Sequence, residues 1–283
     1  MRKILLFATI VLLLAACAPK STPLPQIDPT EVVQEVTQVS PSATIEMPLE
    51  VTVSILPQQY FVERIGGDLI KVNVMVQPGE SPATYEPKPE QMTALSNSAA
   101  YFSIGVPFES AWLEKISAAN SKMLVIDTTE GVDRKANGKG EFDPHIWLSP
   151  SLVKIQSETI LNALISLDPI NEEVYQSNYQ RFMDDIDNLD STIRDTLTQS
   201  EGKSFIVFHP AWGYFASDYG LEMISIEVGG QEPSAKELAE IIQQAKEKSI
   251  KVIFAQPEFS QEAAETIASE IGGEVILISP LNP

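Results

Sequence analysis

Short, nearly continuous apolar runs alternate with amphipathic stretches over most of this chain. Runs of this kind are typical of strands that are buried on both faces of parallel sheets. They fall into two groups of four, one on each side of the middle of the chain. The predicted strands are 51–56, 70–76, 100–104, 123–126, 204–208, 222–226, 252–255 and 274–278. Helical patterns lie between them, such as 234–248, where Ser234 is suited to cap the helix.

The middle of the chain predicts one long helix. Asp168 is a typical N-cap, and Pro169 suits the first helical position. No further Pro or Gly occurs up to about Gln199, and the apolar residues follow at spacings of three and four. The stripe consists of Tyr175, Tyr179, Phe182, Ile186, Leu189, Ile193 and Leu197. A helix of about 30 residues would be roughly 45 Å long, enough to connect two lobes, and the stripe could equally pack on the body.

These patterns predict the α/β fold class with two lobes, each a four-stranded, mostly parallel sheet flanked by helices. One long rigid helix would join the lobes. We place the N-terminal lobe at 49–166, the connecting helix at 167–200 and the C-terminal lobe at 201–283. Since 43% of the 283 residues are hydrophobic, the chain is large enough to give both lobes a core.

The N-terminus carries the marks of a lipoprotein signal peptide. Basic residues at positions 2 and 3 precede an apolar run at 4–14 that is too short to span a bilayer comfortably. The sequence that ends in Cys17 then resembles the bacterial lipobox, in which the cysteine is lipidated. We therefore expect a signal peptide at 1–17, lipid on Cys17, and a disordered tether at 18–48, which contains six prolines. The alternative is an ordinary secretory signal with an incidental cysteine.

Charge and cysteine content narrow the classes of partner. A formal net charge of −20 argues against nucleic acid and anionic lipid as direct ligands. Because Cys17 is the only cysteine in the sequence, no internal disulfide can form. We expect a monomer that works outside the cytoplasm, at a cell surface or in a periplasm, and is anchored to a membrane by lipid.

The two histidines of the sequence both lie in distinctive contexts. His145 belongs to the segment DPHIWLSP at 143–150, just before a predicted helix. His209 follows a predicted strand directly, at the edge of a parallel sheet where ligands bind. One imidazole from each lobe would make a metal site at the interface between the lobes. The alternative is that each histidine is a hydrogen-bonded structural residue.

Three segments carry a resemblance to a known family. They are QPGESPATYEPKP at 77–89, DPHIWLSP at 143–150 and HPAWGYFASDYGL at 209–221. From about residue 50 to its end, the chain resembles the zinc/manganese ABC-transporter solute-binding lipoproteins, which have the TroA-like fold. The resemblance implies two lobes joined by a long helix, with Zn²⁺ or Mn²⁺ held in the cleft as cargo for an ABC permease and no reaction catalysed. His145 and His209 match two of the family's four ligand positions.

The other two ligand positions depart from the family pattern. Ala83 stands where the family usually has histidine, and Ser279 stands where it often has aspartate. We expect a carboxylate to replace them, with Glu227 as the first candidate, Glu258 as the second, and Glu86 and Tyr85 as the third. The predicted metal site is therefore His145, His209 and Glu227, a set that suits Zn²⁺ with added water, whereas more oxygen would favour Mn²⁺.

Alternatives to metal delivery stay open at this point. The loss of two ligands could mean a different cargo, or an adhesion or scaffold role. A metal hydrolase is disfavoured, because the sequence contains no His-Glu-x-x-His and no Gly-x-Ser-x-Gly motif. Residues 130–142 lack the histidine-rich loop of many zinc-binding members. Family members usually continue into another helix, so we also expect the C-terminal lobe to be truncated at Pro283 and to expose an apolar face.

Overall fold

A computed structural model describes residues 47–136, 140–200 and 203–282. The predicted signal peptide with Cys17, and the predicted tether up to residue 46, lie outside these residues. Residues 46–283 form one compact unit by their contacts. The lobe boundaries at 49–166, 167–200 and 201–283 therefore stay a prediction. In the described part, no helix has the length and apolar character that a bilayer crossing requires.

The N-terminal sheet contains the first four strands, all parallel, in the order β2-β1-β3-β4. Its strands are β1 (Leu49–Val53), β2 (Ile70–Val74), β3 (Ala100–Ser103) and β4 (Leu124–Asp127). The register pairs Val51 with Val72 on one side and with Ala100 on the other. Val51 and Val53 are fully buried, as expected for a central strand that is covered on both faces.

The C-terminal sheet repeats this arrangement, with four parallel strands in the order β6-β5-β7-β8. Its strands are β5 (Ser204–Val207), β6 (Glu222–Ser225), β7 (Val252–Ala255) and β8 (Glu274–Leu277). All eight predicted strands are confirmed, each within a few residues of its expected bounds. The two four-stranded sheets confirm the predicted α/β fold class.

The shared strand order determines where each sheet opens. In both sheets the second strand lies on one side of the first, and the third strand lies on the other. Loops that leave the first and third strands therefore diverge and open a crevice at the carboxyl edge of the sheet. In the C-terminal sheet this crevice lies between the ends of β5 and β7, which are followed by His209 and Glu258.

Eight α-helices and four short 3₁₀ turns connect the strands in the described residues. The helices are α1 (Leu56–Gly66), α2 (Pro89–Ala94), α3 (Pro107–Ala119), α4 (Pro150–Leu167), α5 (Glu172–Leu197), α6 (Gly213–Asp218), α7 (Ala235–Glu247) and α8 (Glu262–Ile271). The 3₁₀ turns are Gly67–Leu69, Leu95–Asn97, Ile146–Leu148 and Pro169–Asn171. The helix predicted at 234–248 is confirmed as α7, and the Ser234 hydroxyl accepts a hydrogen bond from the backbone N–H of Glu237.

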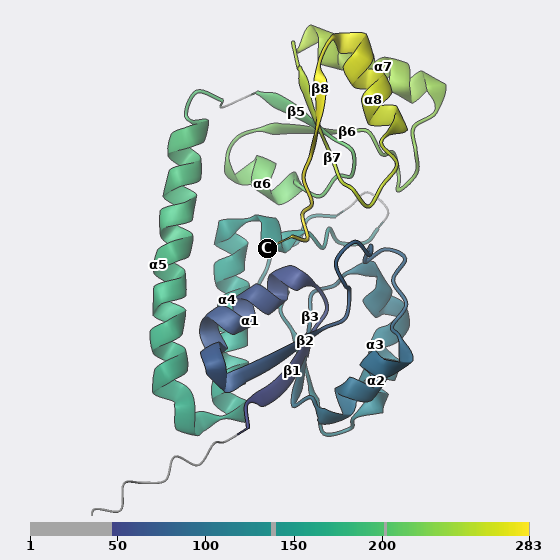
Figure 1. The fold of residues 1–283 in the computed structure, drawn as a ribbon. Coiled ribbons are helices and arrows are strands. Elements are labelled where there is room, and N and C mark those ends of the chain that lie inside the picture. The colour runs from purple at the N-terminus through teal and green to yellow at the C-terminus, as the bar shows by residue number, and fades with distance from the viewer. Residues whose placement is uncertain (1–46, 137–139, 201–202, 283) are drawn as a thin grey trace, which may run out of the picture. The chain divides into compact units, whose positions relative to one another are not determined.

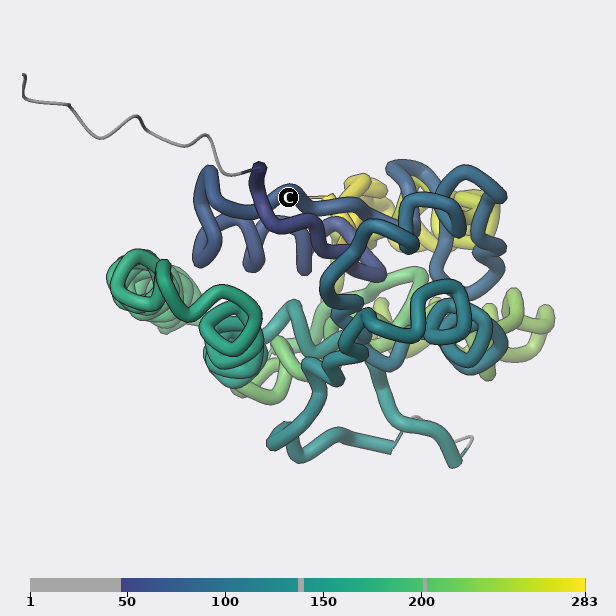
Figure 2. Tube along the Cα trace, turned by 90° about the horizontal axis from the view of Figure 1, so that it is seen from below, coloured from purple at the N-terminus to yellow at the C-terminus, as the bar shows by residue number. Residues whose placement is uncertain are grey.

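The long predicted helix is α5, which has 26 residues and begins later than expected. The Pro169–Asn171 segment forms a 3₁₀ turn, and Asp168 stands at the N-cap position of this turn, without a side-chain capping hydrogen bond, and not at the start of the α-helix. The helix runs alongside both lobes (Figure 1), and α4 and α5 lie side by side when they are viewed end-on (Figure 2). Its apolar stripe is covered unevenly, because Phe182 is 1% exposed and Leu189 is 49% exposed.

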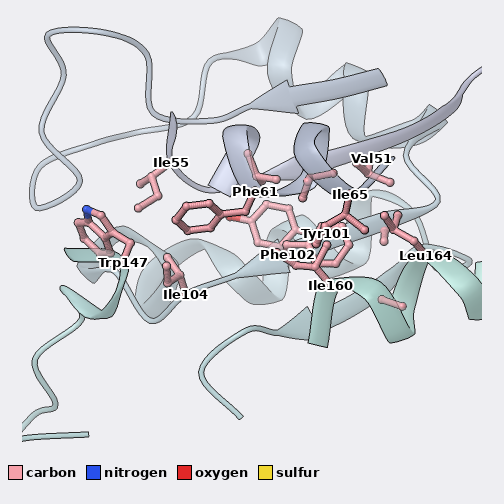
Figure 3. Close-up of a cluster of buried hydrophobic side chains, with 14 of the residues drawn as sticks. Val51, Ile55, Phe61, Ile65, Tyr101, Phe102, Ile104, Trp147, Ile160 and Leu164 are labelled. Carbon is pink, nitrogen blue, oxygen red and sulfur yellow. The ribbon is translucent and has the colours of Figure 1, made fainter. Parts of the chain in front are cut away.

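The larger of two buried apolar clusters belongs to the N-terminal lobe. Figure 3 shows Phe61 and Ile65 of α1 meeting Ile160 and Leu164 of α4 across the strand residues between them. Trp147 lies at one end of this cluster (Figure 3), next to the residues that form the candidate site. The core therefore reaches the cleft between the lobes.

The C-terminal lobe has its own buried cluster, built from its strands with α7 and α8. The same lobe carries an apolar hollow of about 380 Å³ on its sheet. Phe205, Trp212, Phe215 and Phe254 are among the residues that line it. Truncation of this lobe at Pro283 stays a prediction.

The uneven burial of α5 generates a prediction about stability. Phe182 packs against Phe61, with ring centroids 5.9 Å apart, so Phe182→Ala leaves a cavity between α5 and α1. We expect it to lower the free energy of unfolding by about 3–5 kcal/mol. Leu189→Ala on the same stripe is the matched control and should cost about 1 kcal/mol or less. Urea unfolding of both variants measures the difference, and equal losses would contradict this packing.

Candidate metal site

His145 is positioned by the loop that leads from β4 to α4. His145 directly precedes the 3₁₀ turn Ile146–Leu148, and Ser149, which follows this turn, caps α4. Asp143 accepts two hydrogen bonds through Oδ1, one from the backbone N–H of His145 at 3.0 Å and one at Nδ1 of its ring at 2.7 Å. The His145 side chain is 14% exposed. The ring is therefore held on one side, and Nε2 is its remaining nitrogen.

His209 is positioned from the other lobe by the end of β5. Its Nδ1 lies 2.7 Å from Oε2 of Glu227, which follows β6. Its backbone N–H donates to the Gln256 side chain at 3.3 Å. The ring of Phe259 stacks on the His209 ring, with centroids 5.2 Å apart and planes 19° apart. Three contacts from neighbouring loops thus fix this second imidazole.

The two imidazoles converge as the sequence predicted. Nε2 of His145 and Nε2 of His209 are 3.3 Å apart, and the ring centroids are 5.1 Å apart. Two nitrogens that each lie about 2.0–2.1 Å from one tetrahedral Zn²⁺ are themselves roughly 3.3 Å apart. With each Nδ1 donating to a carboxylate, both Nε2 lone pairs point to a common position. The spacing therefore matches two ligands of a single divalent cation.

Each imidazole has a carboxylate at its Nδ1 atom, on the side of the ring away from Nε2. Glu227, which is 10% exposed, contacts Nδ1 of His209 and so lies on the side of the ring away from the meeting point. Asp143 has the same relation to His145. Carboxylates in such positions select the tautomer and the orientation of a ligating histidine. Direct coordination by Glu227 stays a prediction. Our sequence reasoning missed Asp143, although its place two residues before His145 was an available signal.

The cavity around the pair is acidic. It has a volume of about 860 Å³. Its carboxylate-bearing lining residues are Glu141, Asp143, Glu227, Glu232 and Glu258. No Lys or Arg is among the described residues that line it. A cleft lined by one sign of charge concentrates ions of the opposite sign, so this cavity attracts cations.

The remaining candidates differ in where the structure places them. Ala83 lines the cavity and carries no donor atom, whereas Ser279 donates a hydrogen bond to Oε1 of Glu258 at 2.9 Å. Tyr85 is buried with its hydroxyl bonded to Gln91, and Glu86 is exposed; neither lines the cavity. Among the described residues, no group of three or more His, Cys, Asp or Glu side chains is gathered to hold a metal ion. The two imidazoles are therefore the preassembled part of the site.

Burial sets the protonation of His145. It lowers the pKa of the His145 imidazole below its ordinary value of 6.5, and the hydrogen bond to Asp143 only partly opposes this effect. The neutral ring, which is the form that binds metal, therefore prevails at neutral pH.

Hydrogen bonds between the lobes surround the site. Trp147 donates from Nε1 to the carbonyl oxygen of Pro280 at 2.8 Å. The Tyr214 hydroxyl donates to the carbonyl oxygen of Asp143 at 3.0 Å. Ser149 donates to Oδ2 of Asp218 at 2.5 Å. Because these bonds join the two lobes next to the histidines, they maintain the distance between the two rings.

The comparisons agree with this geometry. The model of the family described as zinc-uptake complex component A, periplasmic, matches residues 51–283. The chain belongs to this family. Its members are extracytoplasmic solute-binding proteins of transport systems and not enzymes, with a divalent metal ion as cargo. The resemblance, the fold and the general function predicted from the sequence are thereby confirmed.

Individual relatives support the assignment. The high-affinity zinc uptake system protein ZnuA of Bacillus subtilis is 29% identical over 251 residues, which cover 82% of this chain and 78% of that protein. A crystal structure of ZnuA matches with 48% identity and a TM-score of 0.81, covering 83% of this chain and 92% of the other. The laminin-binding protein of Streptococcus agalactiae, described as both adhesin and metal transporter, matches with 25% identity and a TM-score of 0.76, covering 83% and 90%.

The carboxylate behind His145 generates a prediction. In Asp143→Asn an amide replaces the acceptor, so the preference for the tautomer with a free Nε2 weakens. We expect the dissociation constant for Zn²⁺ to rise by about 10- to 100-fold. Isothermal titration measures this change. Glu240→Gln, on an exposed residue of α7 outside the cavity, is the control and should leave the affinity unchanged. An Asp143→Asn protein that binds like wild type would show that Asp143 has no such role.

Proposed function

We propose that this chain captures Zn²⁺ between His145 and His209 in the cleft and delivers it to an ABC permease. The observation that carries the proposal is the 3.3 Å separation of the two Nε2 atoms, each on a ring whose Nδ1 is bonded to a carboxylate. The acidic lining of the cavity supports a cation as the cargo. A relative described as a high-affinity zinc uptake protein supports zinc as its identity.

Capture proceeds by ligand exchange. Water leaves the hydrated ion as the two Nε2 atoms bind. Each Nδ1 keeps its proton and continues to donate it to the carboxylate of Asp143 or Glu227. Two imidazole nitrogens favour Zn²⁺ over Mn²⁺, because Mn²⁺ prefers oxygen ligands and lies lower in the affinity order of divalent ions. Mn²⁺ is thus a weaker alternative cargo for this site.

The anchor and the partner complete the proposal. Lipid on Cys17 would hold the protein at the outer face of a membrane, and a tether of about 30 residues would let the body reach roughly 30 Å from the lipid. The family's place in a zinc-uptake complex supports an ABC permease as the partner. We propose that the protein acts as a monomer, because both imidazoles come from one chain.

Removal of either imidazole tests the proposal directly. His145→Ala or His209→Ala leaves one fixed nitrogen, and we expect each variant to weaken Zn²⁺ binding by more than about 100-fold, beyond the effect of an outer carboxylate. Isothermal titration with ZnCl₂ gives the affinities, and circular dichroism verifies the fold. If both variants bind Zn²⁺ as wild type does, the ion binds elsewhere and the proposal is wrong.

The lowered pKa of His145 generates a pH prediction. Above pH 6.5 the ring is neutral and Zn²⁺ affinity should change little, because no proton competes for His145. As the pH falls below the lowered pKa, protonation should progressively weaken binding. Titrations between pH 7.5 and about pH 5 measure this dependence. An affinity that falls most steeply above pH 6.5 would contradict a neutral His145 ring in that range.

A further inference from the structure

We propose that Glu258 supplies the third protein ligand for the captured cation and that Ser279 holds its carboxylate ready. This inference rests on the proposed function and names the residue that completes its site. The two imidazoles alone would leave the ion with weak protein coordination. The loop after β7 carries the carboxylate that is best placed to strengthen it.

The topology places Glu258 opposite His209. The loops after β5 and β7 leave the C-terminal sheet at the point where its strand order reverses, and the crevice opens between them. His209 follows β5, and Glu258 follows β7 three residues after its last residue, Ala255. Both side chains line the same cavity. Glu258 is partly buried there, unlike Glu232, which is exposed.

The loop that carries Glu258 is fastened to His209 on both sides of the glutamate. Gln256 accepts a hydrogen bond from the backbone N–H of His209, and the ring of Phe259 stacks on the His209 ring. Because residues 256 and 259 are both held against His209, residue 258 stays near the ligating imidazole. A shift of the β7–α8 loop would therefore also disturb His209.

One carboxylate oxygen of Glu258 accepts a hydrogen bond, and the other is available to coordinate a cation. Ser279, which follows β8, donates from Oγ to Oε1 of Glu258 at 2.9 Å. No hydrogen bond within the described residues occupies Oε2. By contrast, Oε2 of Glu227 is bonded to Nδ1 of His209. Glu258 is thus the better candidate for a carboxylate oxygen that coordinates the ion directly.

This arrangement explains the serine at position 279. An aspartate there would offer its own oxygen, whereas the serine hydroxyl is a weak ligand and a good donor. The serine therefore orients a carboxylate that comes from the neighbouring strand. In the structure Glu258 does not yet join the rings in a group of three, so the cation must draw it in by rotation of its side chain. The completed shell is N, N, O and water, which suits Zn²⁺.

Substitution of the pair tests the inference. In Glu258→Gln the charged ligand is lost with little change in shape, and the dissociation constant for Zn²⁺ should rise by more than about 100-fold, beyond the effect of an outer partner. Ser279→Ala removes only the orienting hydroxyl and should cost about 10- to 100-fold. Glu240→Gln, on the exposed face of α7 outside the cavity, is the control and should bind as wild type does. Isothermal titration of each purified protein with ZnCl₂ gives the affinities.

A rescue variant and a spectroscopic readout separate coordination from a structural effect. The double variant Glu258→Gln with Ser279→Asp should recover most of the lost affinity, because a carboxylate oxygen returns to the same wall of the cavity. With Co²⁺ as the probe, the strong visible absorption of a four-coordinate ion should weaken in Glu258→Gln and return in the double variant.

The outcomes also distinguish this inference from the proposed function. If His145→Ala and His209→Ala lose binding while Glu258→Gln behaves like Glu240→Gln, the imidazole site stands and the role of Glu258 is overturned. A Co²⁺ spectrum that is unchanged in Glu258→Gln overturns it as well. If neither histidine variant affects binding, both the proposed function and this inference fail.

Discussion

The site depends on two imidazole nitrogens that face each other at 3.3 Å while their partner nitrogens are bonded to carboxylates. With both Nδ1 atoms protonated, two lone pairs point at one position and repel each other. A positive charge between them turns this repulsion into coordination. The acidic cavity adds to the effect, because it raises the local concentration of cations. In the proposed function, cation capture thus follows from the hydrogen bonds between each Nδ1 and its carboxylate.

Such an arrangement requires a fixed distance between the two lobes. The first half of α5 is buried against the N-terminal lobe. Its second half is bound to Tyr219, which directly follows α6 and donates to Asp190 at 2.8 Å. Trp147 links the end of the N-terminal core to the carbonyl oxygen of Pro280. A stiff connector and direct bonds between the lobes oppose a wide hinge motion. Movements of side chains and loops at the cavity are therefore better suited than movements of whole lobes to let the ion enter and leave.

The cavity combines fixed and adjustable groups. Phe259 and Gln256 hold His209, whereas one oxygen of Glu258 has no hydrogen bond among the described residues. In the proposed mechanism, two nitrogens that are already in place recognise the ion, and an oxygen that joins afterwards adds affinity. Withdrawal of this side chain would lower the affinity before the two nitrogens let the ion go, which suits the proposed delivery to a permease.

Local patterns in the sequence determined the eight strands, the α7 cap at Ser234 and the two candidate histidines, His209 after a strand and His145 before a helix. Periodicity, capping and strand ends all depend on nearby residues. Tertiary structure decided the rest. The 3₁₀ turn shifted the start of α5, and Leu189 stayed half-exposed on an unbroken apolar stripe because no lobe covers it. Glu227 contacts Nδ1 of His209, and Asp143 plays the matching role for His145. A carboxylate can coordinate the ion directly or accept a hydrogen bond from Nδ1 of an imidazole. Which of the two occurs depends on packing between distant segments, and no local sequence pattern contains this information.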